Sequence, residues 1–487
     1  MRKKHFAFLS RPFLALSGVM ILACALAVSP VLGGGNTTGE GIIGYTPSSS
    51  LFLDEEWYRV NLIKGVDLWN GGLDGESGMG AYREDFDGFF RVTLDRTWRP
   101  WTGMPSTSVA QSRAIYMNVE AYRAAGPAEG KRFLAAVEKG VDCLLNRFRD
   151  PEYGGFYWTV APDGRVIDPM KQGYGNVHPL FALAQAYGVT KDPRHLAAAL
   201  EQLEVIKSRF LDPKFPSGIR PGFSRDFGRV IGVNNGDVFT HLFEALLALY
   251  DVTEGAKREE VAGLIETCGD FLVKTLYRDQ AGYTDRGYVA YNYTEDWRPS
   301  QEPYSRRRQW DGAMHSSPGH GVELAYLLSR AVERGFDPEW LVTVRKLMKF
   351  CLEYAFDAKT GGMLYEVLDY EGRPLLGNPD NTYFLWWPQM ESARALLHCA
   401  VARGWETGEA FKRIESFIQN YLIDREYGGL YQQLKADTLI PDVLDKGNIW
   451  KTNYHYTLFF AEALRLCAAY PARVASLNAG YRNKEGP

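Results

Sequence analysis

"YGGLYQQLKADTLIPD", residues 427–442, carries a pattern that occurs twice earlier in the same chain. The earlier copies are "YGGFYWTVAPDGRVID" at residues 153–168 and "TGGMLYEVLDYEGRPL" at residues 360–375. Each copy has two glycines, an aromatic or apolar run and a polar turn, which is typical of a short β-hairpin. A motif that returns along the chain predicts a fold made of repeated units.

Looser copies extend the repeat toward the N-terminus and into the middle of the chain. They are "DGFFRVTLDRTWRP" at residues 87–100, "RPGFSRDFGRV" at residues 220–230 and "AGYTDRGYVAY" at residues 281–291. The glycines that precede the aromatic or apolar run are Gly88, Gly155, Gly222, Gly282, Gly362 and Gly429. They are 67, 67, 60, 80 and 67 residues apart. This spacing predicts about six units.

Two helical patterns generally fill each interval. "HPLFALAQAYGVT" at residues 178–190 precedes "PRHLAAALEQLEVIKSRFL", and "DVFTHLFEALLALYDVT" at residues 237–253 precedes "KREEVAGLIETCGDFLVKTLY". A helix pair cannot bury its apolar face alone, so it stacks on its neighbours. We predict an all-α fold, an (α/α)6 barrel with short β-hairpins on one rim, where loops shape a pocket. An open solenoid is the alternative, and the hairpins favour closure.

The N-terminus predicts export. Basic Arg2, Lys3 and Lys4 precede an apolar stretch at residues 13–28, which is typical of a secretory signal. "ILAC" also resembles a loose lipobox around Cys24, and the 16 apolar residues are just short of a membrane span. We therefore expect residues 1–32 to be a signal peptide or an N-terminal lipid or membrane anchor. The protein would be periplasmic, secreted or membrane-anchored.

The rest of the chain divides into a linker and one large unit. "GGGNTTGEGIIGYTPSSS" predicts a flexible linker, assigned to residues 33–56. Residues 57–475 would form the barrel and residues 476–487 a C-terminal tail. The remaining cysteines are odd in number, lie in apolar helical contexts and form no CxxC pair, so we expect buried thiols rather than disulfides or a zinc site. They are Cys143, Cys268, Cys351, Cys399 and Cys467.

Composition narrows the classes of partner. The net charge of −4 argues against nucleic acid, which asks for a basic patch or stripe. Aromatic residues make up 14% of the 487 residues. Rings in such numbers suit a core, and they also suit sugar-stacking surfaces.

Three of the eight histidines begin predicted helices. His241 lies in "DVFTHLFEAL", His320 in "GHGVELAYLL" and His455 in "NIWKTNYHYTLFFAEAL". In a toroid the starts of alternate helices gather on one rim, so these imidazoles would converge. A helix N-terminus disfavours the imidazolium form, and a neutral imidazole can act as a base. Glu323, one turn after His320, would orient that ring or counter the shift.

The same segments resemble the N-acylglucosamine 2-epimerase superfamily, which includes cellobiose and mannobiose 2-epimerases and aldose–ketose isomerases. "QSRAIY" resembles Q-A-R-x-x-W, "DPMKQGYG" resembles D-x-x-K-x-x-Y, and "THLFEAL" resembles H-x-H-x-x-E-A with Phe239 at the first histidine. "GHGVELAYLL" resembles G-H-x-I-E-x-x-W-L-L, "WWPQMES" resembles W-W-x-Q-A-E, and "WKTNYH" resembles W-K-x-P-Y-H without the proline. The matches span residues 111–455 in the family's order.

The resemblance implies an (α/α)6 barrel and a reaction without metal or redox cofactor. The sugar ring opens, the C2 proton is removed to give an enediolate, and a proton is returned. Carried over, His320 and His455 would flank C2, Arg113 would stabilise the enediolate, and Glu323 would assist His320. The residues implied in sugar binding are Tyr174, His241, Trp386, Trp387, Glu391 and His178, the last at a position where an aromatic residue is common.

Three functions stay open at this point. The first is a sugar 2-epimerase or isomerase acting on the reducing end of a mono- or oligosaccharide. The second is a glycoside hydrolase or lyase, which needs two carboxylates across the pocket; the candidates are Asp237, Glu323, Glu391 and Asp442. The third is a non-catalytic barrel that binds carbohydrate or a partner. The chain would be a monomer or homodimer, with possible membrane association at its N-terminus.

Overall fold

The computed structural model describes residues 49, 51–302, 316–365, 367 and 383–485, and these are predominantly helical. The helices are α1 Glu55–Gly71, α2 Ser108–Glu129, α3 Lys131–Cys143, α4 Tyr174–Thr190, α5 Pro193–Val205, α6 Gly236–Val252, α7 Gly255–Phe271, α8 Pro318–Glu333, α9 Trp340–Tyr354, α10 Trp386–Ala402, α11 Gly408–Phe417, α12 Tyr454–Ala469 and α13 Pro471–Glu485. Single π-helical turns extend α3, α5, α7 and α11; they are Leu144–Phe148, Ile206–Phe210, Leu272–Leu276 and Ile418–Leu422.

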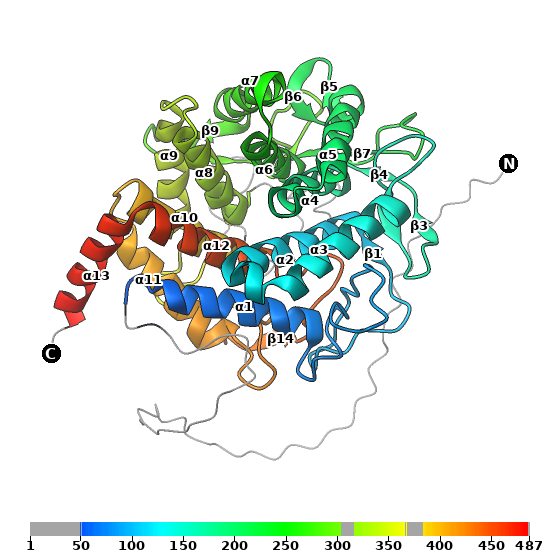
Figure 1. Cartoon of the computed structure of the whole chain (residues 1–487). Coiled ribbons are helices and arrows are strands. Elements are labelled where there is room, and N and C mark those ends of the chain that lie inside the picture. The colour runs from blue at the N-terminus through cyan, green and yellow to red at the C-terminus, as the bar shows by residue number, and fades with distance from the viewer. Residues whose placement is uncertain (1–48, 50, 303–315, 366, 368–382, 486–487) are drawn as a thin grey trace, which may run out of the picture. The chain divides into compact units, whose positions relative to one another are not determined.

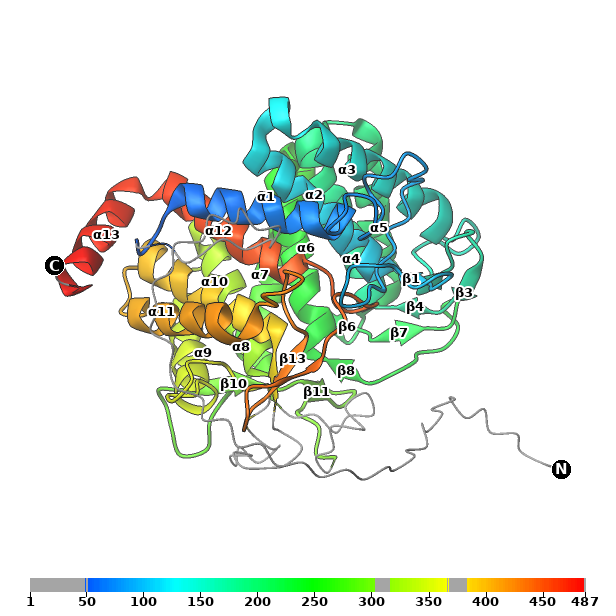
Figure 2. The same ribbon diagram turned by 90° about the horizontal axis from the view of Figure 1, so that it is seen from below.

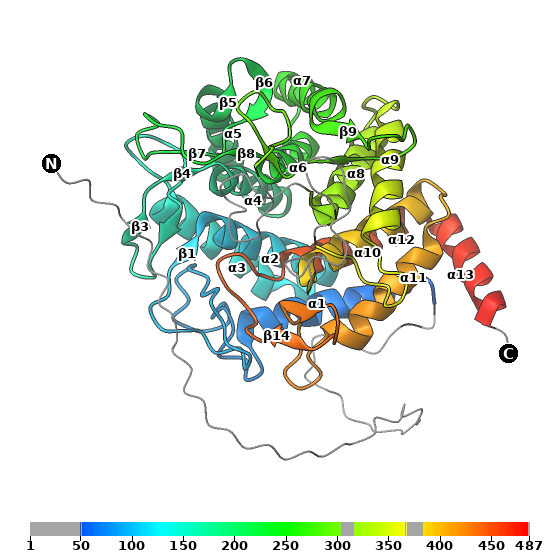
Figure 3. The ribbon, with the colours of Figure 1, turned by 180° about the vertical axis from the view of Figure 1, so that it is seen from behind.

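Helices α2, α4, α6, α8, α10 and α12 form a closed inner ring, in which each contacts the next and α12 contacts α2. The outer helices α3, α5, α7, α9 and α11 each pack on the inner helix that precedes them, and α1 packs on α12 (Figure 1). Figure 3 shows the same two rings from behind. Helix α1, the first helix of the described residues, therefore forms the sixth helix pair with α12. The predicted (α/α)6 barrel is confirmed, and the open solenoid is wrong.

The sequence of each helix matches its ring. Helix α4 contains no charged residue, and residues 174–184 are buried without interruption. The outer helix α3 buries only one face. A helix that is apolar all round must be covered on all sides, whereas an outer helix needs one apolar stripe.

Short antiparallel strands join the helices. They are β1 Ser106–Thr107, β2 Thr159–Val160, β3 Val166–Asp168, β4 Lys171–Gln172, β5 Leu211–Asp212, β6 Phe215–Ile219, β7 Gly222–Phe223, β8 Asn234–Asn235, β9 Tyr277–Asp279, β10 Gly287–Val289, β11 Asn292–Tyr293, β12 Tyr383–Leu385, β13 Gln433–Lys435 and β14 Pro441–Val443. They form the sheets β1-β2-β3, β12-β13-β14, β4-β7, β5-β6, β8-β11 and β9-β10. Figure 2 shows β7, β8, β10, β11 and β13 along the same edge of the helices.

The three tight copies of the repeat fold alike at their glycine pairs. The N–H of Asp424 donates to the carbonyl of Gly429 at 2.9 Å, and the N–H of Gly428 donates to the carbonyl of Asp424 at 2.8 Å. The corresponding bonds recur at residues 150–155 and 357–362. The glycines that mark two of the looser copies do not lie in turns of this kind. Gly282 lies in the turn between β9 and β10, and Gly222 lies in β7, paired with β4. The hairpin predicted at residues 366–375 lies largely outside the described residues.

Two of these turns each contain a buried aspartate that is paired with two cations. The Asp424 carboxylate accepts hydrogen bonds from Lys446 Nζ at 2.7 Å and from Arg96 Nε at 2.9 Å. Asp150 accepts from Lys171 Nζ and from Arg225 Nε, both at 2.9 Å. Burial opposes ionisation, but these hydrogen bonds outweigh it and hold the pKa of both aspartates below the usual range. Each cluster fastens the turn of one repeat to a loop of another.

Gly429→Ala should destabilise the fold. Gly429 has a φ of +66°, and a Cβ there would lie 2.7 Å from Cζ2 of Trp98. Both the backbone conformation and the overlap oppose a side chain, so we expect a loss of more than about 1 kcal/mol of unfolding free energy. The matched control is Gly263→Ala on α7, where an added Cβ meets nothing within 4 Å. That change should raise the urea midpoint slightly, and equal effects of both would contradict the account.

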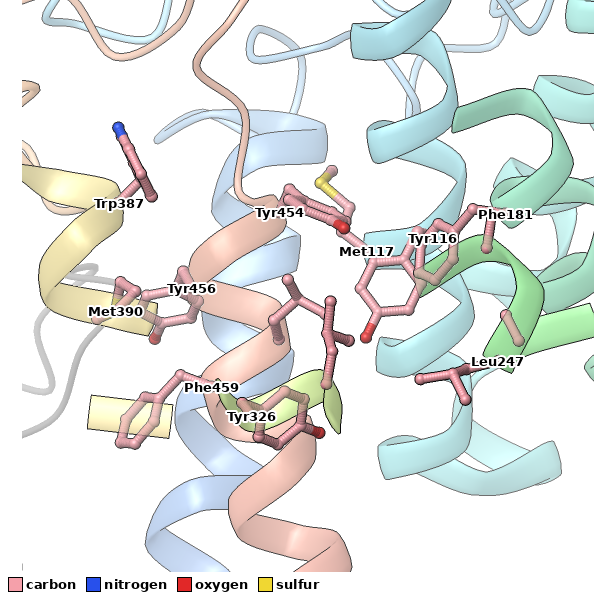
Figure 4. Packing of buried hydrophobic residues seen from close by; sticks show 14 of the residues in the cluster. Tyr116, Met117, Phe181, Leu247, Tyr326, Trp387, Met390, Tyr454, Tyr456 and Phe459 are labelled. Carbon is pink, nitrogen blue, oxygen red and sulfur yellow. The ribbon is translucent and has the colours of Figure 1, made fainter. Parts of the chain in front are cut away.

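Aromatic side chains of several inner helices, among them Tyr116, Phe181, Tyr326 and Tyr454, belong to the buried core (Figure 4). The ring of Tyr116 lies 4.8 Å from Phe181 and 5.6 Å from Tyr454, measured between centroids. The five described cysteines are buried and free, as expected. Within the described ranges, no helix combines the length and the apolar character needed to cross a bilayer. The predicted signal or anchor at residues 1–32 lies outside them, and α13 covers most of the predicted tail.

Candidate functional site

The N-terminal ends of the inner helices meet around a cavity of about 230 Å³. Its walls include seven of the predicted site residues, each within the first six residues of its helix. They are Arg113, Tyr174, His241, His320, Trp386, Trp387 and His455. The predicted convergence of helix starts is therefore confirmed. Because helix N-termini carry a partial positive charge, this end of the barrel favours a negative charge on a bound molecule.

Three predicted residues lie beneath the cavity rather than in its wall. Glu391 is buried and its Oε1 lies 2.7 Å from Nδ1 of His455. His178 accepts a hydrogen bond from Nε of Arg113 at 3.2 Å, so it positions the guanidinium. Glu323 is fully buried and makes no hydrogen bond within the described ranges. The expectation that Glu323 lines the pocket is wrong, and so is the expectation that it orients His320, which bonds Ser317 and Asp237 instead. The alternative, that its charge counters the helix dipole at His320, stays a prediction.

His320 is held by other groups. Its Nδ1 lies 2.7 Å from Oγ of Ser317, the residue before α8, and its Nε2 lies 3.1 Å from Oδ1 of Asp237. The ring of Trp387 packs on it at 4.6 Å between centroids. Gly319 makes room for this, because a Cβ there would lie 2.5 Å from the Trp387 ring. The glycine before His320 therefore admits the tryptophan that supports the imidazole.

His455 is a neutral imidazole. Burial, with Arg113 and His241 nearby, holds the pKa of His455 well below its usual range. Its Nδ1 faces Glu391, and its Nε2 has no hydrogen-bond partner among the described residues. A ring whose Nδ1–H donates to a carboxylate keeps its lone pair on Nε2.

His241 is a charged imidazole. Its Nδ1 lies 3.0 Å from Oε2 of Glu244, and its Nε2 lies 3.4 Å from Oδ1 of Asp237. Burial opposes the charge, but the attraction of Glu323 and the bonds to Asp237 and Glu244 raise the pKa of His241 to about 10. The cavity therefore has a second fixed cation beside Arg113.

Arg113 is fixed in orientation by three further partners besides His178. Its Nη1 donates to the carbonyl of Trp450 at 2.9 Å, and its Nη2 donates to the hydroxyl of Tyr174. The guanidinium also lies over the ring of Tyr454, 4.6 Å from its centroid. Preorganised donors of this kind stabilise charge that develops during a reaction, because they need no rearrangement.

A buried carboxylate cluster, Glu244, Glu323 and Glu391, lies next to the imidazoles of His241 and His455. Burial, with the neighbouring carboxylate of Glu391, raises the pKa of Glu323 to about 7, and burial raises the pKa of Glu391 to about 7. Ligand atoms of His241, Glu244 and Glu323 lie within 4.8 Å of one another, as do those of Glu323, Glu391 and His455. Because each histidine Nδ1 already bonds a carboxylate, this set fits shared protons better than a metal ion.

Several residues of the cavity wall were not predicted as sugar-site residues, and Trp450 and Asp237 are two of them. Trp450 lines the cavity and precedes His455 by five residues within the segment "WKTNYH". Asp237 lies one helical turn before His241, and the sequence predicts it only as a candidate hydrolase carboxylate. The signal for Asp237 was its spacing from His241, which places both on one helix face.

The four hydrolase carboxylates do not form a pair across the cavity. Asp237 lies in the wall, Glu323 and Glu391 are buried below it, and Asp442 is exposed on β14. A glycosidase needs two carboxyl groups flanking the scissile bond. Within the described ranges, the site does not offer that arrangement.

A larger hollow of about 600 Å³ lies toward the C-terminal ends of the inner helices. Its arginines are paired with acidic neighbours, such as Arg123 with Glu120 and Arg465 with Glu462. Cations there also compensate the negative ends of the helix dipoles. None of the predicted site residues lines it. The smaller cavity is therefore the candidate site despite its size.

The chain matches known proteins over most of its length. The family model described as N-acylglucosamine 2-epimerase (GlcNAc 2-epimerase) matches residues 88–458. The cellobiose 2-epimerase of Bacteroides fragilis is 24% identical over 72% of this chain and 84% of that protein. The D-mannose isomerase of Marinomonas mediterranea is 26% identical over 71% of this chain and 83% of that protein. A solved structure of a D-mannose isomerase shares the fold, with a TM-score of 0.69 and 20% identity over 84% of this chain and 97% of that one.

Proposed function

The chain belongs to the N-acylglucosamine 2-epimerase family and is an isomerase of that kind, and on this premise we propose that it moves protons at C2 of a reducing sugar with His320 and His455. The observation that carries the proposal is the placement of these imidazoles. Both line one cavity, and both contact the ring of Trp387. Two proton-transfer groups beside fixed cations are what an enediolate reaction requires.

We assign proton removal to His455. Its neutral ring keeps a lone pair on Nε2, because Nδ1–H donates to Glu391. When Nε2 takes the C2 proton, the ring becomes positive and the Glu391 carboxylate stabilises it. A carboxylate behind an imidazole acts in this way in catalytic triads.

We assign proton return to His320. It first assists ring opening, so that C2 becomes acidic beside the aldehyde. The electron pair left on C2 spreads to the oxygens of the enediolate, which Arg113 and the His241 cation stabilise. Return of a proton to the opposite face gives the 2-epimer. Return to C1 from the face of His455 gives the ketose.

Aromatic rings supply the binding surface. Trp386, Trp387 and Trp450 all line the cavity. A sugar presents C–H groups to such rings and hydroxyls to the polar groups between them. Together with the named activities of the similar proteins, cellobiose 2-epimerase and D-mannose isomerase, this supports an aldose, free or at the reducing end of an oligosaccharide, as substrate.

The proposal is tested by product analysis with D-mannose, cellobiose and N-acetylglucosamine. We expect the 2-epimer or the ketose of at least one sugar, formed by the wild-type protein and not by His320→Ala or His455→Ala. Cleavage of the glycosidic bond would instead indicate a hydrolase. Binding without conversion, across a broad panel of aldoses, would indicate a carbohydrate-binding barrel and would contradict the proposal.

Activity should rise with pH through about 7. Below that value Glu391 binds a proton, because its pKa is raised to about 7 by burial. The protonated acid donates to Nδ1 of His455, which forces the ring proton onto Nε2 and blocks the base. We expect kcat/KM to fall about tenfold per pH unit on the acid side of the midpoint.

Glu391→Gln should remove this pH dependence between pH 6 and 8 and lower the rate at least tenfold. The matched control is Glu415→Gln, a buried glutamate on the outer helix α11, which should keep the wild-type profile. A flat wild-type profile from pH 5.5 to 8 would contradict the assignment of Glu391.

A further inference from the structure

Asp237 lies between two imidazoles of the site. It is in the first turn of α6, where the dipole favours a carboxylate. Its Oδ1 lies 3.1 Å from Nε2 of His320 on α8 and 3.4 Å from Nε2 of His241, one turn further along α6. The side chain is 14% exposed and lines the cavity. One oxygen atom therefore contacts both histidines at the surface that a sugar would meet.

The chemistry of these contacts fixes where the protons lie. An ionised carboxylate can only accept hydrogen bonds, so Nε2 of His320, which bonds Asp237, must carry a hydrogen. Nε2 of His241 lies nearer to the hydroxyl of Tyr174, at 3.2 Å. Burial opposes ionisation of Asp237, but His320 and His241 hold its pKa below the usual range. The Ser317 hydroxyl at Nδ1 of His320 can donate or accept a hydrogen bond, so it is compatible with a ring that carries hydrogens on both nitrogens.

The same reasoning distinguishes the two proton-transfer histidines. At His455, the buried carboxylate of Glu391 bonds Nδ1. The ring proton is therefore on Nδ1, and Nε2 carries none. The carboxylate at His320 bonds Nε2 itself. Because the two carboxylates bond different ring nitrogens, Nε2 of His455 is a proton acceptor and Nε2 of His320 is a proton donor.

We propose that Asp237 is a positioning residue that holds a proton on Nε2 of His320, and thereby makes His320 the proton donor of the pair. This rests on the proposed function. His320 gives its Nε2 proton to C2 of the enediolate, the C2–H bond forms from the enediolate electron pair, and the ring is left neutral with its proton on Nδ1. His455 has meanwhile gained the proton that left C2, so charge and protons balance. Asp237 keeps its bond to His241 while the Nε2–H of His320 turns to the sugar.

The experiment uses full-length protein labelled with ¹⁵N-histidine, with the His320 signals assigned by their loss in His320→Gln. In the free wild-type protein at neutral pH, two-bond ¹H–¹⁵N spectra should show Nε2 of His320 protonated. Asp237→Asn should shift His320 toward the form protonated on Nδ1 alone and leave the His455 signals in place. It should also lower kcat at least tenfold while KM changes less than threefold.

Asp251→Asn is the matched control, because Asp251 lies at the other end of α6 in an ion pair with Arg334. It should change neither the His320 signals nor kcat. If Asp237→Asn is poorly folded, Asp237→Ser should give the same result with a smaller side chain. Unchanged His320 signals in the folded variant would overturn the proposal, as would a rise in KM alone, which would make Asp237 a sugar ligand. If the wild-type protein converts no sugar, the proposed function fails while the spectra still report on Asp237 and His320.

Discussion

His320→Ala and His455→Ala should each lower kcat by about 10²–10⁴-fold, the usual contribution of a positioned acid or base. His455 removes the proton, whereas His320 assists ring opening and returns a proton to C2, so loss of either histidine lowers turnover. KM should change little, because the sugar is held mainly by other residues of the cavity. Initial rates of epimer or ketose formation measure both effects.

The double variant should be only slightly slower than the slower single variant. Groups that act as one unit are not additive, since the second has nothing to act on once the first is lost. The control is His195→Gln, a buried histidine on α5 that bonds Oγ1 of Thr190 and lies outside the cavity. It should keep wild-type turnover. A single variant at His320 or His455 with near-normal turnover would remove that histidine from the mechanism.

Asp424→Asn should lower the free energy of unfolding by about 3–5 kcal/mol, the cost of leaving a buried charge without its partner. Both Asp424 and Lys446 are fully buried in their side chains, and Arg96 adds a second cation to the same carboxylate. Removal of the negative charge leaves the buried Lys446 without its anionic partner and with Arg96 as its charged neighbour. Urea unfolding followed by circular dichroism measures the loss.

The exposed Asp442 on β14 provides the control for that substitution. Asp442→Asn should change the unfolding free energy by less than about 0.5 kcal/mol, as surface changes usually do. A second variant, Asp424→Asn with Lys446→Met, should recover part of the loss because no charged amine remains unpaired. Equal stability of Asp424→Asn and the wild-type protein would contradict the role of this cluster.

The fold was predictable because its main signal is local. The apolar patterns of "HPLFALAQAYGVT" and "DVFTHLFEALLALYDVT" mark helices covered on all sides, and these are α4 and α6 of the inner ring. The closure of the barrel was harder to predict from the sequence. Helix α1 precedes every repeat mark and completes the pair of α12, almost 400 residues away in sequence, and no local pattern reports such a contact.

The site was predictable where a residue begins a helix, and less so where its partner is on another helix. His241, His320 and His455 share a sequence context that places them on one rim, and the structure brings them together. Glu323 has the spacing of a partner for His320, yet His320 bonds Asp237 instead. Helical spacing fixes which face a side chain is on, whereas contacts between helices depend on packing of the whole ring.

Exchange of the C2 hydrogen with solvent tests the central claim most directly. The wild-type protein is incubated in deuterium oxide with the sugar that it converts, and proton NMR follows the C2 signal. We predict loss of that signal in the product with the wild-type protein, no exchange with His455→Ala, and residual exchange without inversion with His320→Ala. Conversion of the sugar to its 2-epimer with full retention of the original hydrogen at C2 would show that no second histidine delivers a proton there, and it would contradict the account.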